Sequence, residues 1–153
     1  MVIMAFIIAN ENEYGFSEIT EGGGGDVQPL ITNSEGRTVL PFEIVLQGTF
    51  PFYCGEVREY NGIADSSQGR INIEHRRVIR TKQMEATDTF VVGAKVYFSP
   101  GGAGAAGLII DEASKSAGDI EYGVCEGFGG SAGAHTYIDV RPFAYDESRV
   151  LEV

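Results

Sequence analysis

The chain has 153 residues, which is enough for one domain with a hydrophobic core and too few for two independent ones. With 43% hydrophobic and 22% charged residues, its composition argues against disorder of the whole chain. The formal net charge of −11 argues against a nucleic-acid-binding surface, because such a surface needs clustered positive charge to neutralise phosphates. The same charge suits a protein that stays soluble at high copy number, although many cytosolic proteins are equally acidic.

Residues 1–9, MVIMAFIIA, form a continuous apolar run of strand length. Such a run is either the first core strand of its own domain or an arm that docks on another subunit, and we expect the arm. It lacks the basic start of a signal peptide and is far shorter than the ~20 residues that span a membrane. We therefore expect no membrane partner and a location in the cytoplasm or in an assembly formed there. The side chains expected to dock are Val2, Ile3, Phe6, Ile7 and Ile8.

The next segment, residues 10–38, is polar and rich in turn-forming residues. Its four consecutive glycines, residues 22–25, have high backbone entropy and are typical of a flexible connection. The sequence thus predicts an N-terminal arm and glycine-rich flexible segment over residues 1–38, followed by an all-β domain over residues 39–153.

Short apolar or alternating runs, separated by glycine-containing turns, follow from residue 39. Asn61 and Gly62 predict a hairpin, because both residues tolerate a positive φ. Only residues 85–89 favour a turn of helix. The fold predicted from this pattern is all-β, a small β-barrel or sandwich domain with an extended N-terminal arm. The expected strands span residues 39–47, 56–60, 69–80, 95–98, 108–111, 122–126 and 136–141.

Residues able to carry catalysis are few. Histidine is the usual general base or metal ligand near neutral pH, and the chain has two, His75 and His135. Neither has a partner at metal-ligand spacing, so both are expected at the surface or at an interface. Cys54 and Cys125 each lie in an apolar run, which favours two buried thiols and leaves a disulfide between them open. We therefore predict no enzymatic activity, no catalytic residues, no cofactor and no metal site.

Two glycine-rich segments and one acidic pair have simple interpretations. Residues 102–107 match G-x-G-x-x-G, but a dinucleotide site needs a strand that leads directly into a helix, and residues 99–101 interrupt that junction. We expect a flexible turn there and a hairpin loop over residues 127–134. The adjacent Asp111 and Glu112 are expected to be solvated surface charges.

A basic cluster stands out in this acidic chain. His75, Arg76, Arg77, Arg80 and Lys82 lie within eight positions. We expect Arg76, Arg77 and Arg80 to meet an acidic partner surface. The alternative is a charged edge strand that is protected against aggregation.

The order of turns and strands over residues 55–143 resembles the phage capsid decoration (cement) proteins, a family of small head-associated β proteins. The resemblance begins with the strand at Glu56 and Val57, which ends in the turn over residues 61–64. It continues through residues 86–93, ATDTFVVG, into Val96, Tyr97 and Phe98. Residues 122–127, YGVCEG, and the last strand over residues 138–143, IDVRPF, complete it.

This resemblance implies a small β-barrel-like domain that binds the outside of an expanded capsid and strengthens it. It implies contact with the major capsid protein, a homo-oligomer that is often a trimer, a location on the virion surface and no catalytic residues. The alternatives are another virion component of low copy number, such as a head–tail connector or tail protein, and a small β ligand-binding domain.

Overall fold

The computed structural model describes residues 15–19, 30–40, 43–47, 50–54, 63–70, 78–102, 104–143 and 149–150. These residues are almost entirely strands and turns, which confirms the predicted all-β fold class. The strands are β1 (Gly15–Ile19), β2 (Leu30–Thr32), β3 (Glu43–Gln47), β4 (Phe50–Cys54), β5 (Gln68–Arg70), β6 (Val78–Thr81), β7 (Lys95–Ser99), β8 (Leu108–Ile110), β9 (Ile120–Ser131), β10 (Ala134–Pro142) and β11 (Arg149–Val150). A single 3-10 turn, η1 (Glu112–Ser114), interrupts them within the described residues.

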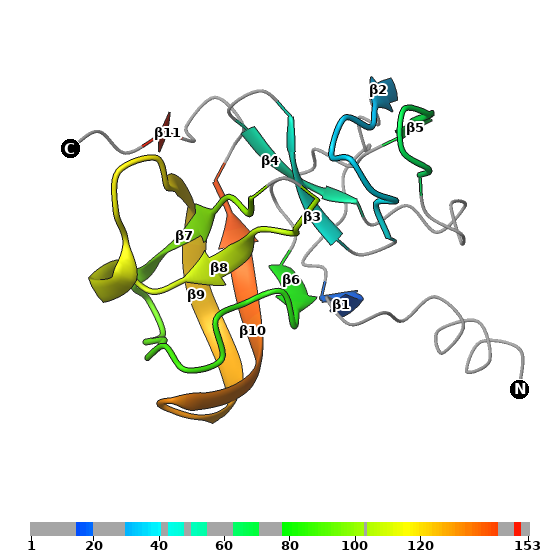
Figure 1. Cartoon of the computed structure of the whole chain (residues 1–153). Coiled ribbons are helices and arrows are strands. Elements are labelled where there is room, and N and C mark those ends of the chain that lie inside the picture. The colour runs from blue at the N-terminus through cyan, green and yellow to red at the C-terminus, as the bar shows by residue number, and fades with distance from the viewer. Residues whose placement is uncertain are drawn as a thin grey trace, which may run out of the picture.

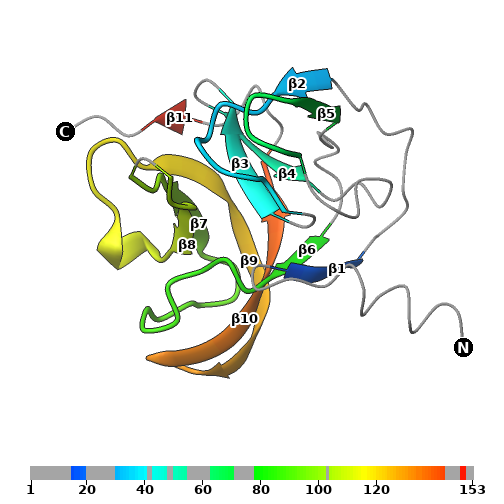
Figure 2. The ribbon, with the colours of Figure 1, turned by 45° about the vertical axis from the view of Figure 1, so that its right-hand side comes forward.

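One antiparallel sheet forms the body of the molecule (Figure 1). Its strands follow the order β1-β6-β10-β9-β7-β8, and β11 adds to β9. Two small antiparallel pairs, β2 with β5 and β3 with β4, complete the described β structure. In Figure 2 the long β9–β10 hairpin curves across the molecule, with β7 and β8 on one side and β6 and β1 on the other.

The outer edge of β8 is covered by the segment that follows β6. Ile109 N–H donates to the carbonyl of Gln83 at 2.9 Å, and Glu85 N–H donates to the carbonyl of Ile109 at 2.8 Å. These bonds accompany a parallel bridge between Met84 and Ile109. The chain thus links the β6 side of the sheet to its β8 end, while the finer expectation of a barrel or a sandwich stays a prediction.

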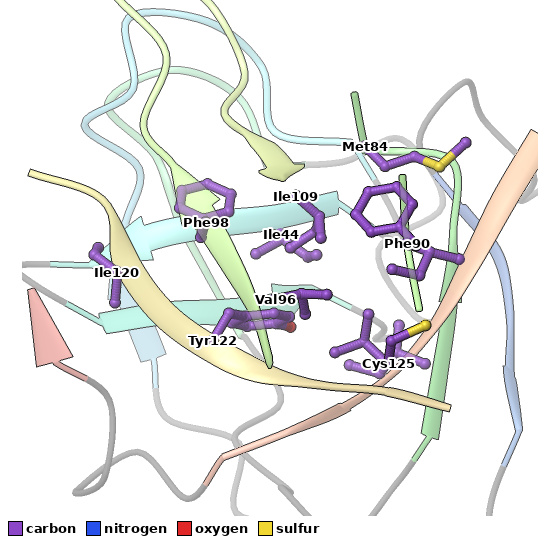
Figure 3. Close-up of a cluster of buried hydrophobic side chains, with 12 residues drawn as sticks. Ile44, Met84, Phe90, Val96, Phe98, Ile109, Ile120, Tyr122 and Cys125 are labelled. Atoms are coloured by element: carbon purple, nitrogen blue, oxygen red, sulfur yellow. The ribbon is translucent and has the colours of Figure 1, made fainter. Parts of the chain in front are cut away.

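The hydrophobic core lies between the curved sheet and β3 (Figure 3). Val96, Tyr97 and Phe98 of β7 are all buried, because β7 is covered on both faces. Ile44 of β3 packs into the same cluster, and burial of such side chains is the main stabilising contribution to the fold. The buried cluster consists of Ile44, Ile79, Met84, Phe90, Val96, Phe98, Ile109, Ile120, Tyr122, Cys125, Ile138 and Val140.

The glycine-rich end of β9 is a strand and not the predicted hairpin loop. β9 pairs with β10 up to Ser131, and only the two residues 132 and 133 form the turn, with Gly133 at φ 78°. A Cβ at Gly129 would overlap the ring of Tyr137 on β10. The glycines of β9 therefore serve close packing between the two strands more than they serve the turn.

Three further expectations differ from the structure. Residues 85–89 form a hydrogen-bonded turn, and the described helical turn is η1 instead. The strand expected over residues 39–47 begins only at Glu43, and Val39 makes an isolated bridge to Ile63. Val78 and Ile79 of β6 are both buried, although strict alternation would expose one of them.

The division at residue 38 stays a prediction, but β structure crosses it. β1 pairs with β6 and β2 pairs with β5, so two strands before residue 38 join strands that follow it. Asn33 adds a buried link, because its side-chain amide donates to the carbonyl of Ile63 at 2.8 Å. The strand expected over residues 56–60, the hairpin at residues 61–62 and the four glycines 22–25 lie outside the described residues.

Candidate functional site

The exposed large hydrophobic side chains of the described residues lie in one turn and on the strand beside it. Val91 and Val92 are 58% and 60% exposed, and Phe128 on β9 is 36% exposed. We name residues 91–94 the valine turn. Gly93 takes φ 89° there, and its N–H donates to the carbonyl of Cys125 at 2.8 Å. Cys125 N–H in turn donates to the carbonyl of Ala94 at 2.9 Å. These two backbone hydrogen bonds fix the valine turn to β9.

A hollow of about 280 Å³ opens beside the valine turn. Its lining is mostly apolar and reaches down to Phe90 and Val96 of the core. Charged residues also belong to the lining, among them Asp111 and Lys95, whose amine lies 3.5 Å from Glu121. We call this cavity the hollow; it is lined by Thr89, Phe90, Val91, Ala94, Lys95, Val96, Asp111, Glu112 and Ala113.

Asp111 fixes the loop that leads into the valine turn. Its two carboxylate oxygens accept the backbone N–H groups of Thr89 at 2.9 Å and Ser114 at 2.8 Å. Asp88 adds two hydrogen bonds to the same region. Its carboxylate accepts the N–H of Asp111 at 2.8 Å and the hydroxyl of Ser114 at 3.0 Å. Burial raises the pKa of Asp111, but the hydrogen bonds that it accepts, chiefly from Thr89 and Ser114, together lower the pKa by more. The pKa of Asp111 therefore lies below its ordinary value. Asp111 is only 8% exposed, and the expectation of a solvated surface charge was wrong for it.

His135 holds the other side of the same loop. Its Nε2 lies 3.1 Å from Phe90 N–H and its Nδ1 lies 3.2 Å from the carbonyl of Gly129. Because a backbone N–H can only donate, these partners assign the acceptor role to Nε2 and the proton to Nδ1. The ring contacts Phe90 and Phe128, with centroids 5.0 and 4.7 Å away. At 4% exposure His135 is a buried structural residue, so the expected surface position was wrong.

Arg80, the described member of the expected basic interface, has partners within its own chain. Its guanidinium donates to both carboxylate oxygens of Asp139, at 2.8 and 3.0 Å, and lies 4.1 Å from the centroid of the Tyr137 ring. The hydrogen bond to Asp139 raises the pKa of Arg80. Its role at an interface stays a prediction. The remaining expected interface residues, Val2, Ile3, Phe6, Ile7, Ile8, Arg76 and Arg77, lie outside the described residues.

Two buried reactive groups, the thiol of Cys125 and the hydroxyl of Tyr122, belong to the core cluster. Cys125 is a free buried thiol, so no disulfide joins it to Cys54, and burial raises its pKa. Burial also raises the pKa of Tyr122, whose hydroxyl has no hydrogen-bond partner among the described residues (Figure 3).

No group of three or more His, Cys, Asp or Glu side chains in the described ranges could hold a metal ion. The G-x-G-x-x-G segment leads into the strand β8, where a dinucleotide site would need a helix.

No helix within the described ranges is long and apolar enough to cross a membrane. No family model matches the chain, and neither the curated proteins nor the solved structures contain a match to it. The function therefore has to be argued from the residues themselves.

The sequence did not point to the valine turn as a surface. Two adjacent β-branched residues favour a strand, and the resemblance placed them in the approach to β7. The available signal was Gly93, which follows them directly and takes the positive φ that closes the turn. With that signal, both valines can be assigned to the turn and not to the strand.

Proposed function

We propose that the chain is a non-enzymatic capsid decoration (cement) protein. In this proposal it forms a homo-oligomer, binds the major capsid protein on the outer surface of a viral head and stabilises the lattice. The virion surface is its location, after assembly in the host cytoplasm, and nucleic acid and membranes are not among its partners.

One observation carries the proposal: a β framework presents exposed valines on a turn that is held in place from three sides. Asp111 and His135 bind the loop before the valine turn, and Cys125 binds the turn itself. A pre-organised apolar surface loses little conformational entropy when it binds another protein. This arrangement suits a binding protein better than a ligand-gated or catalytic one.

A decoration protein also gains from repetition. Each copy on a capsid needs only a modest contact, because copies linked in an oligomer bind the lattice together. The net charge of −11 fits a protein that stays soluble at high copy number and is repelled by nucleic-acid phosphates. The strands β7, β9 and β10 span much of residues 95–143, over which the sequence resembles the decoration proteins.

Quantitative mass spectrometry of purified particles from the source of this sequence tests the proposal. We expect a simple ratio to the major capsid protein, such as one to one or one to two. A few copies per particle would instead support the head–tail connector or tail protein. Complete absence from particles would contradict both virion assignments.

The hollow favours one alternative of a different class, a small β ligand-binding domain. Its volume of about 280 Å³ lies near the lower end of the range for small-molecule sites. A thermal-shift screen with nucleotides, divalent metals and small apolar ligands separates the two proposals. A rise of several degrees in Tm with one specific ligand would favour the ligand-binding domain.

A further inference from the structure

We propose that His135 is a pH-sensitive switch for residues 90–92. Its neutral imidazole holds this segment in place, and uptake of a proton releases it. The segment carries Val91 and Val92, the two most exposed of the large hydrophobic side chains described. The switch acts on this surface whatever partner covers it, and so goes beyond the proposed function.

One hydrogen bond holds the segment between two fixed points. Thr89, directly before it, donates its N–H to Asp111 at 2.9 Å, and Gly93, directly after it, is bound to β9. Between these points, the N–H of Phe90 donates to Nε2 of His135 at 3.1 Å. Within the described residues, no other hydrogen bond joins the segment to a residue beyond the valine turn. The path of the two valines therefore depends on this bond.

Only the neutral imidazole can make the bond. The N–H of Phe90 directs its proton at Nε2, so Nε2 has to offer a lone pair. A protonated Nε2 would place a second N–H against the first, with no acceptor between them. Nδ1 cannot take over the acceptor role, because it faces the carbonyl of Gly129 at 3.2 Å and a carbonyl only accepts. Uptake of a proton by His135 therefore requires that the bond to Phe90 breaks.

The surroundings of the ring offer no counter-charge to a protonated imidazole. His135 is buried, and its ring contacts the rings of Phe90 and Phe128. No ion pair of the described residues includes His135. A buried cation that lacks a carboxylate partner is costly, so the proton also favours the opened segment.

The titratable and charged groups on the elements packed against His135 have partners of their own. The loop before the valine turn and the end of β8 carry acidic groups, and β9 and β10 carry groups of both signs. These groups and their partners are Glu85 with Thr87, Asp88 with Ser114, Asp111 with Thr89, Glu121 with Lys95, Cys125 with the carbonyl of Gly127, Glu126 with Arg141, and Asp139 and Tyr137 with Arg80.

The switch operates in a pH range that leaves the neighbouring contacts intact. A histidine side chain in water takes up its proton below about pH 6.5. The bond to Phe90 is therefore present above this pH and is lost as the pH falls below it. Asp111, whose pKa lies below its ordinary value, keeps its charge and its bond to Thr89 over the same range. The ring of Phe90 lies in the core (Figure 3), so the opening is confined to the segment and does not unfold the domain.

Amide hydrogen exchange at about pH 7.5 and about pH 5.5, corrected for the pH dependence of exchange itself, tests the switch. In the wild type we expect Phe90 N–H to lose about tenfold of its protection at the lower pH, while Ile109 N–H keeps its own. His135→Gln should show no such loss, because the side-chain carbonyl of glutamine can accept the same N–H and does not titrate. His75→Gln removes the other histidine of the chain and is the matched control, which should behave as the wild type does. An absent loss in the wild type, or a loss that persists in His135→Gln, would overturn the inference.

Nitrogen NMR of the histidine rings provides a second readout that needs no variant. At about pH 7.5 we expect the ring proton of His135 on Nδ1 and a bare Nε2. As the pH falls, protonation of His135 and the loss of protection at Phe90 should share one midpoint. Protonation of His135 without loss of protection at Phe90, or a ring that stays neutral at about pH 5.5, would show that no switch exists. Both readouts use the purified chain alone, so they are independent of the particle stoichiometry that tests the proposed function.

Discussion

Two buried polar side chains, His135 and Asp111, hold the loop that carries the valine turn. Each binds a backbone N–H of that loop, at Phe90 and Thr89 respectively. A buried backbone N–H without an acceptor lowers the stability of the fold. These two side chains supply the acceptors that a neighbouring strand would supply in a sheet. Their effect is expected in stability and in the position of the turn.

Replacement of His135 by Phe isolates the hydrogen bonds from the ring contacts. The aromatic ring keeps its place between Phe90 and Phe128, but Phe90 N–H loses its acceptor. We expect a loss of about 1–3 kcal/mol in the free energy of unfolding, measured by urea denaturation. Thr136→Ala, at the exposed next position, is the control. An unchanged free energy in His135→Phe would show that the bond to Phe90 contributes nothing.

Asp111 predicts a defined pH dependence. Its pKa is lower in the folded chain than in the unfolded chain, so its contribution to stability is fully present above the unfolded pKa of about 3.9. That contribution is lost as the pH falls through the folded pKa. Asp111→Asn should therefore destabilise the protein near neutral pH by about 1–2 kcal/mol, because the amide nitrogen cannot accept one of the two backbone N–H groups that the carboxylate accepts.

The difference between Asp111→Asn and the wild type should shrink below about pH 4, where the wild-type carboxylate becomes protonated. Urea denaturation at a series of pH values measures it. Glu112→Gln, whose side chain is 56% exposed, serves as the control and should show little effect. A difference that stays constant down to pH 2 would contradict the assignment.

At the scale of elements, the side chain of Gln83, in the segment after β6, hydrogen-bonds directly to β3. Gln83 is fully buried, and its amide accepts Ile44 N–H at 2.7 Å and donates to the carbonyl of Ile44 at 2.9 Å. It also donates to the carbonyl of Gly107 at 2.9 Å. The amide thus takes the place of a paired strand for Ile44 and connects β3 to the loop before β8.

Gln83→Leu keeps the volume of the side chain and removes all three hydrogen bonds. The backbone groups of Ile44 and Gly107 then stay buried without partners, and we expect destabilisation by about 3 kcal/mol. Amide hydrogen exchange provides the specific readout, because Ile44 N–H should lose protection while Ile109 N–H, which donates to the Gln83 backbone, should keep more of it. Equal protection of Ile44 in both proteins would contradict this role of Gln83.

The sequence predicted those strands whose local residue pattern is sufficient to indicate a strand. The strands expected over residues 95–98 and 136–141 correspond to β7 and β10. The glycine-rich end of β9 was not predicted, because glycine usually marks a turn and here makes room for Tyr137. The burial of His135 depends on a shift of register between His135 and Tyr137, which no local pattern reveals.

At the scale of the whole molecule, the candidate site could be predicted least. The hollow is formed by residues 89–91, 94–96 and 111–113, and hydrogen bonds among Asp88, Asp111 and Ser114 bring these segments together. Sequence reasoning treated Asp111 as surface charge because acidic pairs are common in a chain with 22 acidic residues. Only the folded arrangement shows that this carboxylate fixes a loop and forms part of a cavity wall.

The bonds that position the valine turn also set the order in which the surface can form. Apart from local turn bonds, the loop before it and the turn itself are held by partners 22 or more positions further along the chain, on β8, β9 and β10. Such non-local contacts slow folding, because the loops that they close lose entropy before the contacts form. A chain still emerging from the ribosome, or one cut short before β10, does not display the finished surface. Display of the fixed valine turn is thus a property of the completed fold, because Cys125 on β9 and His135 on β10 supply bonds that hold it.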